Sequence, residues 1–199
     1  MVIGITGPAG SGKSTVSKLI KKILNNKVCI IDVDRVGHEV LALFLIKKKL
    51  REVFGEKIFD NEGNISRVKL GNIVFSDKEK LEILNQTVHP AIFKKTREIL
   101  KKSLKKSDII ILDAALLHKI GLDKLCDKII LVESTKQKRI ERLIDKRGVP
   151  KEKAEKIVNS QNLENLGYYD FKIYNEEDIN KLYKEVAKIV QKFQGGVFE

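Results

Sequence analysis

Residues 2–14 read VIGITGPAGSGKS, an apolar run that leads directly into a glycine-rich loop with a lysine and a serine at its end. The loop, residues 7–14, matches the pattern G-x-x-x-x-G-K-[ST] without a mismatch. Its glycines let the backbone curl so that successive N–H groups point at one anion. An amphipathic helix is expected to begin at Lys13 and to offer its N-terminal dipole to the same anion. The stretch therefore predicts a P-loop that holds the phosphates of a nucleoside triphosphate.

Separate roles are expected for the side chains of this loop. Lys13 is expected to reach the β- and γ-phosphates and to act in catalysis, and the Ser14 hydroxyl is expected to ligate Mg²⁺. A second metal contact, through water, is expected from Asp113, the acid that ends the apolar run Ile109–Asp113. The residues of the loop expected to bind ATP are Gly7, Gly10, Ser11, Gly12, Lys13, Ser14 and Thr15.

The composition of the 199-residue chain limits the class of protein to which it can belong. A length of this order gives one substantial domain with a buried core. The net charge of +12 is spread along most of the chain, which favours a solvated lysine-rich surface over a nucleic-acid site. Its apolar stretches are shorter than the roughly 20 residues of a membrane span, and no secretory signal is visible at the N-terminus. We therefore expect a cytoplasmic protein, in which Cys29 and Cys126 are reduced and buried.

Five apolar runs alternate with stretches of helical periodicity, and such runs are typical of parallel strands that are buried on both faces. The predicted strands are Val2–Thr6, Val28–Asp32, Ile109–Asp113, Lys128–Glu133 and Phe171–Tyr174. Together with the P-loop, this pattern predicts an α/β, three-layer fold with a five-stranded parallel sheet, a helical substrate-binding insertion and a helical lid. The first helix is expected over Lys13–Leu24, with a stop at Asn25-Asn26.

Two stretches are too long for simple strand–helix alternation. We expect residues 35–104 to form a helical region that binds the acceptor, and residues 135–162 to form a lid. The nucleotide-binding core is then expected to comprise residues 1–34, 105–134 and 163–199. Within the helical region, helices are expected at Val36–Lys48, Arg67–Phe75 and Lys78–Lys102, with a new helix start at Pro90.

The second predicted strand ends in Asp32, and a second acid, Asp34, stands two residues further on. Residues two apart on a strand share a face, and ligands of open parallel sheets bind at the carboxyl ends of the strands. We expect this end to adjoin that of the first strand, so that Asp34 can take the proton of an attacking hydroxyl, with Asp32 in support. The alternative for these acids is capping of the following helix.

Two arginines of the expected lid, Arg139 and Arg142, are three residues apart and share a helix face. An arginine brought in by a lid can stabilise the charge on a transferring phosphoryl group. Arg139 is the expected catalytic arginine, and Arg142 is expected to contact ATP. The alternative is the solvated charged face of an ordinary helix.

Several segments together resemble the dephospho-coenzyme A kinase family of P-loop kinases. The matching segments, in chain order, are residues 3–14, Asp32-Val33-Asp34, Phe54-Gly55 with Arg67, Val88-His89-Pro90, Leu112–Leu117, and Gln137, Arg139, Arg142, Gln161, Asp170 and Asn175. The resemblance implies transfer of the ATP γ-phosphoryl group to the ribose 3′-hydroxyl of dephospho-coenzyme A, the last step of coenzyme A synthesis, with Asp34 as the base.

The resemblance also implies partners and further site residues. The partners are ATP, Mg²⁺ and dephospho-coenzyme A, with no nucleic acid or membrane, and the chain is expected to be a monomer or weak oligomer. Asn175 is placed on the adenine side of ATP. The residues implied to bind the acceptor are Asp32, Arg67, His89, Pro90, Leu116 and Leu117.

Two other functions are compatible with the P-loop. A small P-loop kinase could act on a nucleoside, a nucleotide or a shikimate-like acceptor. A nucleotide-dependent switch or nucleic-acid-linked ATPase would fit the positive charge. A guanine-reading motif is not completed, however, because Lys138 stands where Asp would follow Thr135-Lys136.

Overall fold

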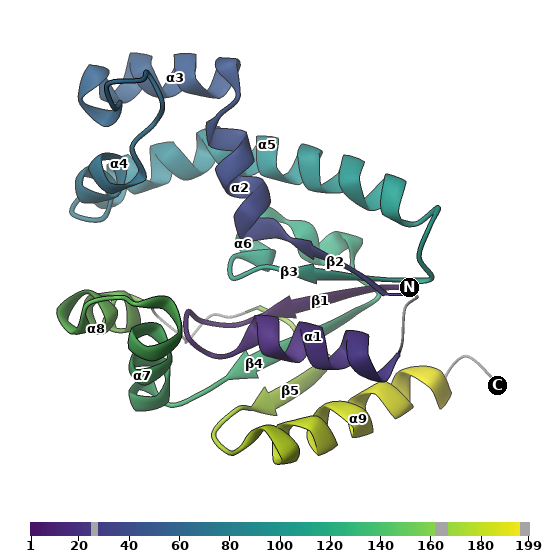
Figure 1. The fold of residues 1–199 in the computed structure, drawn as a ribbon. Helices are drawn as coiled ribbons and strands as arrows, with labels where there is room; N and C mark the ends of the chain where they lie inside the picture. The colour runs from purple at the N-terminus through teal and green to yellow at the C-terminus, as the bar shows by residue number, and fades with distance from the viewer. Residues whose placement is uncertain (25–27, 162–166, 196–199) are drawn as a thin grey trace. The chain divides into compact units, whose positions relative to one another are not determined.

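The computed structural model describes residues 1–24, 28–161 and 167–195 (Figure 1). The chain divides into two compact units, one formed by Met1–Asp32 with Leu100–Glu199 and the other by Val33–Ile99. The expected helix stop at Asn25-Asn26 and the last residue of the expected lid, Asn162, lie outside the described residues. Among the described helices, none has both the length and the hydropathy that a membrane span requires.

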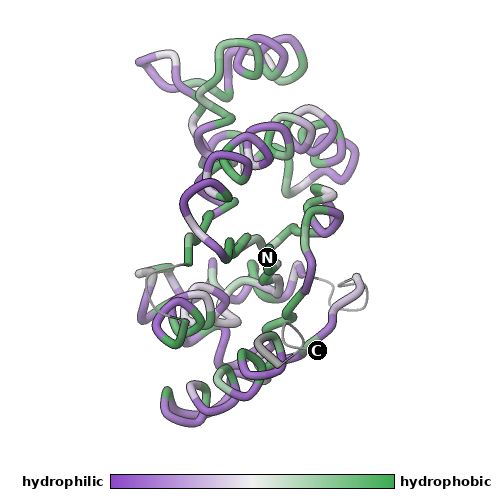
Figure 2. Tube along the Cα trace, turned by 90° about the vertical axis from the view of Figure 1, so that its right-hand side faces the viewer, coloured by the Kyte–Doolittle hydropathy of each residue, from purple (hydrophilic) through white to green (hydrophobic). Residues whose placement is uncertain are grey.

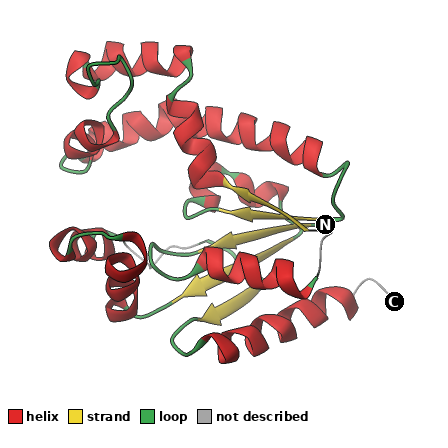
Figure 3. Ribbon diagram, viewed as in Figure 1, coloured by secondary structure: helices red, strands yellow, loops and turns green. Residues whose placement is uncertain are grey.

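A five-stranded sheet forms the centre of the first unit, and all of its strand pairs are parallel (Figure 3). Its strands are β1 (Val2–Thr6), β2 (Val28–Asp32), β3 (Ile109–Asp113), β4 (Lys128–Glu133) and β5 (Phe171–Tyr174). All five have the predicted bounds, because each is a short apolar run between polar or glycine-containing segments. The predicted α/β fold with a parallel sheet is therefore confirmed.

The order of the strands is β2-β3-β1-β4-β5. The expectation that the ends of the first and second strands adjoin is therefore wrong, because β3 lies between them. At the carboxyl end of the sheet, Asp113 of β3 is paired in register with Asp32 of β2 on one side, and with Ile5 of β1 on the other. The strand next to the P-loop on this side therefore carries Asp113.

The core of this unit follows the two-residue alternation of the strands. Ile3 and Ile5 of β1 pack in one apolar cluster with Val16 and Ile20 of α1 (Lys13–Ile23). The cluster also contains residues of α9 (Ile179–Gly195), which lies alongside α1 (Figure 1). Figure 2 shows the hydrophobic strands in green, whereas the helices carry both colours. Each fully buried side chain of this size contributes about 1.5–3 kcal/mol.

Gly4 lies between these isoleucines and faces the other side of the sheet. A Cβ atom at Gly4 would lie 2.8 Å from both Cys126 Sγ and Leu117 Cδ2. Leu117 begins the short helix α6 (Leu117–Ile120), and Cys126 follows the 3₁₀ helix η3 (Leu122–Leu125). Helices therefore cover both faces of the sheet, which is the three-layer arrangement expected.

The stretch that was expected to be a lid forms a helical hairpin, α7 (Lys136–Arg147) and α8 (Lys151–Asn159). Gly148 ends α7 in the left-handed conformation, with φ 61°. Leu143, Ala154 and Val158 form a small core between the two helices. The stretch expected to form the helical lid is thus helical, with a turn at Gly148-Val149-Pro150 between its two helices.

The second unit is helical. Its elements are α2 (Val33–Leu41), α3 (Phe44–Phe54), η2 (Glu56–Ile58), α4 (Arg67–Val74) and α5 (Lys78–Ser103), whose last residues belong to the first unit. The expected single helix at Val36–Lys48 is wrong, because Leu43 adopts extended backbone angles as the N-cap of α3. A new helix start at Pro90 is also wrong, since Pro90 lies inside α5. Burial of Val88 and Ile92 on either side of Pro90 offsets the cost of a proline within the helix.

Candidate nucleotide site

The P-loop follows β1 directly and takes a conformation that requires glycine. Gly7 has φ 144°, and a Cβ atom there would lie 2.1 Å from the backbone oxygen of Val132 in β4. Gly12 has φ 99° and ψ 20° as the N-cap of α1. Thr15 N and Val16 N donate to Gly12 O at 3.0 and 3.1 Å, which closes the first helical turn onto the loop. The loop and the helix N-terminus thus form the anion-binding unit that the motif predicts.

A cavity of about 320 Å³ lies beside this loop. Its lining combines P-loop residues with residues that come from α7, from the loop after β5 and from α9. The lining residues are Gly10, Gly12, Lys13, Ser14, Thr15, Arg142, Lys146, Asn175, Glu177, Ile179 and Leu182. Five residues predicted for ATP from the motif, together with Arg142 and Asn175, therefore share one cavity.

Lys13 is buried at the start of α1, and its Nζ atom lies 3.2 Å from Pro8 O across the loop. Ser14 is exposed at the next position. One turn further on, Ser17 Oγ lies 3.0 Å from Lys13 O and 3.1 Å from Asp113 Oδ2. The Asp113 carboxylate, which is largely buried, is therefore held next to the first two turns of α1.

Arg139 and Arg142 extend from α7 to the backbone of the P-loop. Arg139 is fully buried, and its Nε atom donates to Ala9 O at 2.8 Å. Burial lowers the pKa of the Arg139 guanidinium, and burial likewise lowers that of Arg142. Arg142 Nη1 donates to Ser134 Oγ at 2.9 Å and Nη2 to Asn175 O at 2.6 Å. The alternative of a solvated helix face is therefore wrong for both side chains.

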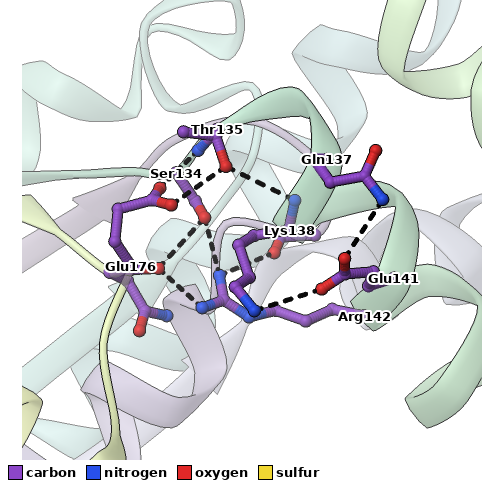
Figure 4. Close-up of polar contacts among 9 residues, drawn as sticks. Ser134, Thr135, Gln137, Lys138, Glu141, Arg142 and Glu176 are labelled. Carbon is purple, nitrogen blue, oxygen red and sulfur yellow. Dashed lines mark hydrogen bonds and ion pairs between the residues drawn. The ribbon is translucent and has the colours of Figure 1, made fainter.

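Residues around the start of α7 complete this network (Figure 4). Glu176 accepts hydrogen bonds from both the N–H and the hydroxyl of Thr135, the N-cap of α7. Asn175 is buried, its side-chain Nδ2 donates to Ser11 O at 2.8 Å, and its backbone carbonyl accepts from Ser134 Oγ at 3.0 Å. The loop after β5 therefore joins α7 to the P-loop.

The residues expected to bind the acceptor are distributed over both units. Asp32 ends β2, whereas Asp34 lies in the first turn of α2, so the expectation that both share one strand face is wrong. Leu116 is exposed just before α6, but Leu117 is buried beneath β1 against Gly4. Arg67 is the exposed first residue of α4, and His89 and Pro90 lie within α5.

Three polar residues of this region received no role from the sequence. Ser17 contacts Asp113, Glu176 binds Thr135, and Gln161 Oε1 accepts from Ala9 N at 3.0 Å. Ser17 could have been found from its position one turn after Ser14 on the same helix face. Gln161 was matched to the family pattern without a role, and Glu176 was not singled out; both approach α7 and the P-loop only through tertiary folding.

The fold and this site define a P-loop kinase of the α/β class. A profile of the family described as "Dephospho-CoA kinase" matches residues 1–181. The chain is 37% identical to the dephospho-CoA kinase of Fusobacterium nucleatum over 96% of its own length and 97% of the relative's. It therefore belongs to the dephospho-CoA kinase family.

Solved structures agree with this fold. A crystal structure of a protein from Thermus thermophilus superposes with a TM-score of 0.74 at 24% identity, over 96% of this chain and 97% of that one. The dephospho-CoA kinase from Campylobacter jejuni superposes with a TM-score of 0.57 at 25% identity, over 96% of each chain. The likeness thus extends over almost the whole length.

Proposed function

We propose that the chain transfers the γ-phosphoryl group of ATP to the ribose 3′-hydroxyl of dephospho-coenzyme A, which forms coenzyme A. The proposal rests on the family match over nearly the whole chain, in which the P-loop cavity supplies the nucleotide site. Its partners are ATP and dephospho-coenzyme A, without nucleic acid or membrane, in a cytoplasmic monomer or weak oligomer.

The nucleotide half of the proposal assigns the phosphates to the P-loop N–H groups, with Lys13 on the β- and γ-phosphates. Mg²⁺ would be held by the Ser14 hydroxyl and, through water, by Asp113; when bound, it neutralises charge on the phosphates. The donor set fits this ion, because a hydroxyl and one carboxylate leave room for water and phosphate oxygens. No cluster of three or more His, Cys, Asp or Glu side chains suited to a metal occurs in the described part of the chain.

In the acceptor half, Asp34 orients the 3′-hydroxyl and takes its proton as the oxygen attacks in line. Its place in the first turn of α2, directly after β2, supports this role, because acceptors of open parallel sheets bind at the carboxyl ends of strands. The remaining assignments follow the family pattern alone. The residues assigned to the acceptor are Asp32, Arg67, His89, Pro90, Leu116 and Leu117. Leu117 is buried against Gly4, so its assigned role is through packing.

The proposed activity is tested by incubating the purified protein with Mg·ATP and dephospho-coenzyme A and identifying products by mass spectrometry. We expect coenzyme A and ADP in equal amounts. A parallel panel of nucleosides, nucleoside monophosphates and shikimate should give no phosphorylated product. Turnover of one of these acceptors, without turnover of dephospho-coenzyme A, would refute the proposal.

The role of Asp34 is tested by Asp34→Asn, with Glu52→Gln as a control because Glu52 is an exposed acid in the same unit. Loss of a positioned base typically lowers the rate by about 10²–10⁴. We expect such a loss in kcat for Asp34→Asn, an unchanged KM for ATP, and wild-type kinetics for Glu52→Gln. Near wild-type turnover of Asp34→Asn would remove Asp34 as the base.

A further inference from the structure

Three side chains, two from α7 and one from the loop after β5, contact the carbonyl oxygens of the P-loop. Arg139 Nε donates to Ala9 O at 2.8 Å, and Asn175 Nδ2 donates to Ser11 O at 2.8 Å. Arg142 Nη1 lies 3.4 Å from Gly10 O and 3.3 Å from Ser11 O. Three consecutive carbonyl oxygens are thus engaged by donors that come from outside the loop.

Gln161, just beyond the end of α8, closes this arrangement. Its Oε1 atom accepts hydrogen bonds from two donors, the N–H of Ala9 at 3.0 Å and Nη2 of Arg139. Arg139 in turn donates to the carbonyl of the same Ala9. Ala9, Arg139 and Gln161 therefore form a closed triangle, in which one amide oxygen fixes both the guanidinium and the loop.

The orientation of these carbonyls determines where the P-loop N–H groups point. A peptide unit is planar and trans, so the C=O of one residue and the N–H of the next point in opposite directions. Donors on Ala9 O and Ser11 O hold these oxygens toward α7 and the loop after β5. The N–H groups of Gly10 and Gly12 belong to the same peptide units, so the contacts to Ala9 O and Ser11 O also fix the direction of these N–H groups.

We propose that Gln161 is a positioning residue for the nucleotide site: its side-chain oxygen fastens Arg139 and the end of α8 to Ala9, and so maintains the P-loop in its phosphate-binding conformation. In this arrangement Arg139 acts on the P-loop, and not on the phosphoryl group that is transferred. This inference rests on the proposed function only in that the P-loop binds a nucleotide.

Arg139 depends on this contact because its surroundings supply few other partners. The side chain is fully buried, and its Nη1 atom has no hydrogen-bond partner among the described residues. Among the described residues, loss of Gln161 Oε1 would leave the buried guanidinium with a single hydrogen bond, the one to Ala9 O. A buried cation that loses a partner is strongly unfavourable, so the loop and α7 should shift to rehydrate it.

The test compares three variants of the full chain. Gln161→Leu keeps the bulk and removes the acceptor, whereas Gln161→Glu keeps an oxygen that can accept from both donors. Gln137→Ala is the matched control, since Gln137 belongs to α7 and bonds only Glu141 among the contacts in Figure 4. Two quantities are measured: the Kd of Mg·ADP by titration calorimetry, and amide hydrogen exchange of the peptide that covers residues 7–14.

We expect Gln161→Leu to weaken Mg·ADP binding by about tenfold or more, as for loss of a hydrogen bond to a charged group. Exchange of the P-loop peptide should speed up in the nucleotide-free variant. Gln161→Glu should restore both quantities to within about threefold of wild type, since the acceptor is kept, and Gln137→Ala should change neither. If Gln161→Leu does not fold, Gln161→Ala removes the same acceptor and carries the same comparison.

Wild-type ADP affinity and wild-type exchange in Gln161→Leu would overturn the inference. Equal defects in Gln161→Leu and Gln161→Glu would overturn it as well, because the acceptor oxygen would then be irrelevant. Neither measurement uses dephospho-coenzyme A. A protein that bound Mg·ADP through this network but failed to phosphorylate dephospho-coenzyme A would refute the proposed function and leave this inference standing.

Discussion

Replacement of Gly12 by alanine should disturb the P-loop in two separable ways. The φ of 99° at Gly12 lies in the left-handed region, where an alanine costs about 1–2 kcal/mol. Its Cβ atom would also lie 2.0 Å from Asn175 Nδ2, so the buried amide must give up its bond to Ser11 O. Loss of that bond costs about 1–3 kcal/mol. We therefore expect Gly12→Ala to lower the free energy of unfolding by about 3 kcal/mol.

The assay is thermal unfolding of nucleotide-free protein, followed by calorimetry. For a chain of this length, about 3 kcal/mol corresponds to a fall in Tm of about 6–12 °C. Gly121→Ala is the matched control, because Gly121 has φ 81° and ψ 16° but nothing lies within 4 Å of an added Cβ atom. It should cost only the backbone term of about 1–2 kcal/mol.

A double-mutant cycle with Asn175→Ala isolates the steric term. In the Asn175→Ala background, Gly12→Ala should cost no more than Gly121→Ala, since the amide that it displaces is gone. The coupling between the two positions should then be about 1–2 kcal/mol. Additive effects within about 0.5 kcal/mol, or equal costs for Gly12→Ala and Gly121→Ala, would refute the reasoning.

Three further predictions concern the same unit. Gly4→Ala should destabilise the fold by about 1–3 kcal/mol through overpacking, and Cys126→Ala should recover part of this loss in thermal unfolding. Burial raises the pKa of the Cys126 thiol to about 12, so iodoacetamide at about pH 8 should leave it unmodified in the folded protein and alkylate it in guanidinium, as read by mass spectrometry. Burial works to raise the pKa of the Asp170 carboxyl, but hydrogen bonds from Ile129 N–H and the Lys128 ammonium outweigh it and lower the pKa. The stability that this carboxylate adds is fully present above its unfolded pKa of about 3.9, and it is lost as the pH falls through the lower folded pKa. The difference in the free energy of urea unfolding between wild type and Asp170→Asn should therefore shrink below about pH 4.

The strands were predictable to the residue, because a short apolar run between polar segments is a local signal. The order of the strands was not, since it depends on which of several similar apolar faces meet. The break at Leu43 carries no glycine or proline to mark it. Conversely, Pro90 marks a helix boundary that packing of its neighbours Val88 and Ile92 overrides.

For the P-loop both the position and the conformation could be predicted from the sequence, whereas for the other residues of the nucleotide site only their identity could. The P-loop is encoded within eight consecutive residues, so its position and backbone form followed from the motif. The sequence also selected Arg139, Arg142 and Asn175 as residues of this site. Their contacts are mostly with backbone carbonyl oxygens. Every residue has such an oxygen, so the sequence could not predict which of them these side chains would bind.

The position of β1 in the middle of the sheet has a consequence for the order in which the protein assembles. Both neighbours of β1 come late in the chain, since Val2 pairs with Ile110 and Ile3 with Lys128. During synthesis, the strand that leads into the P-loop therefore has no partner until more than half of the chain has been made. Loop closure over such separations is slow, so the anion-binding loop, although translated first, should be among the last parts to become ordered.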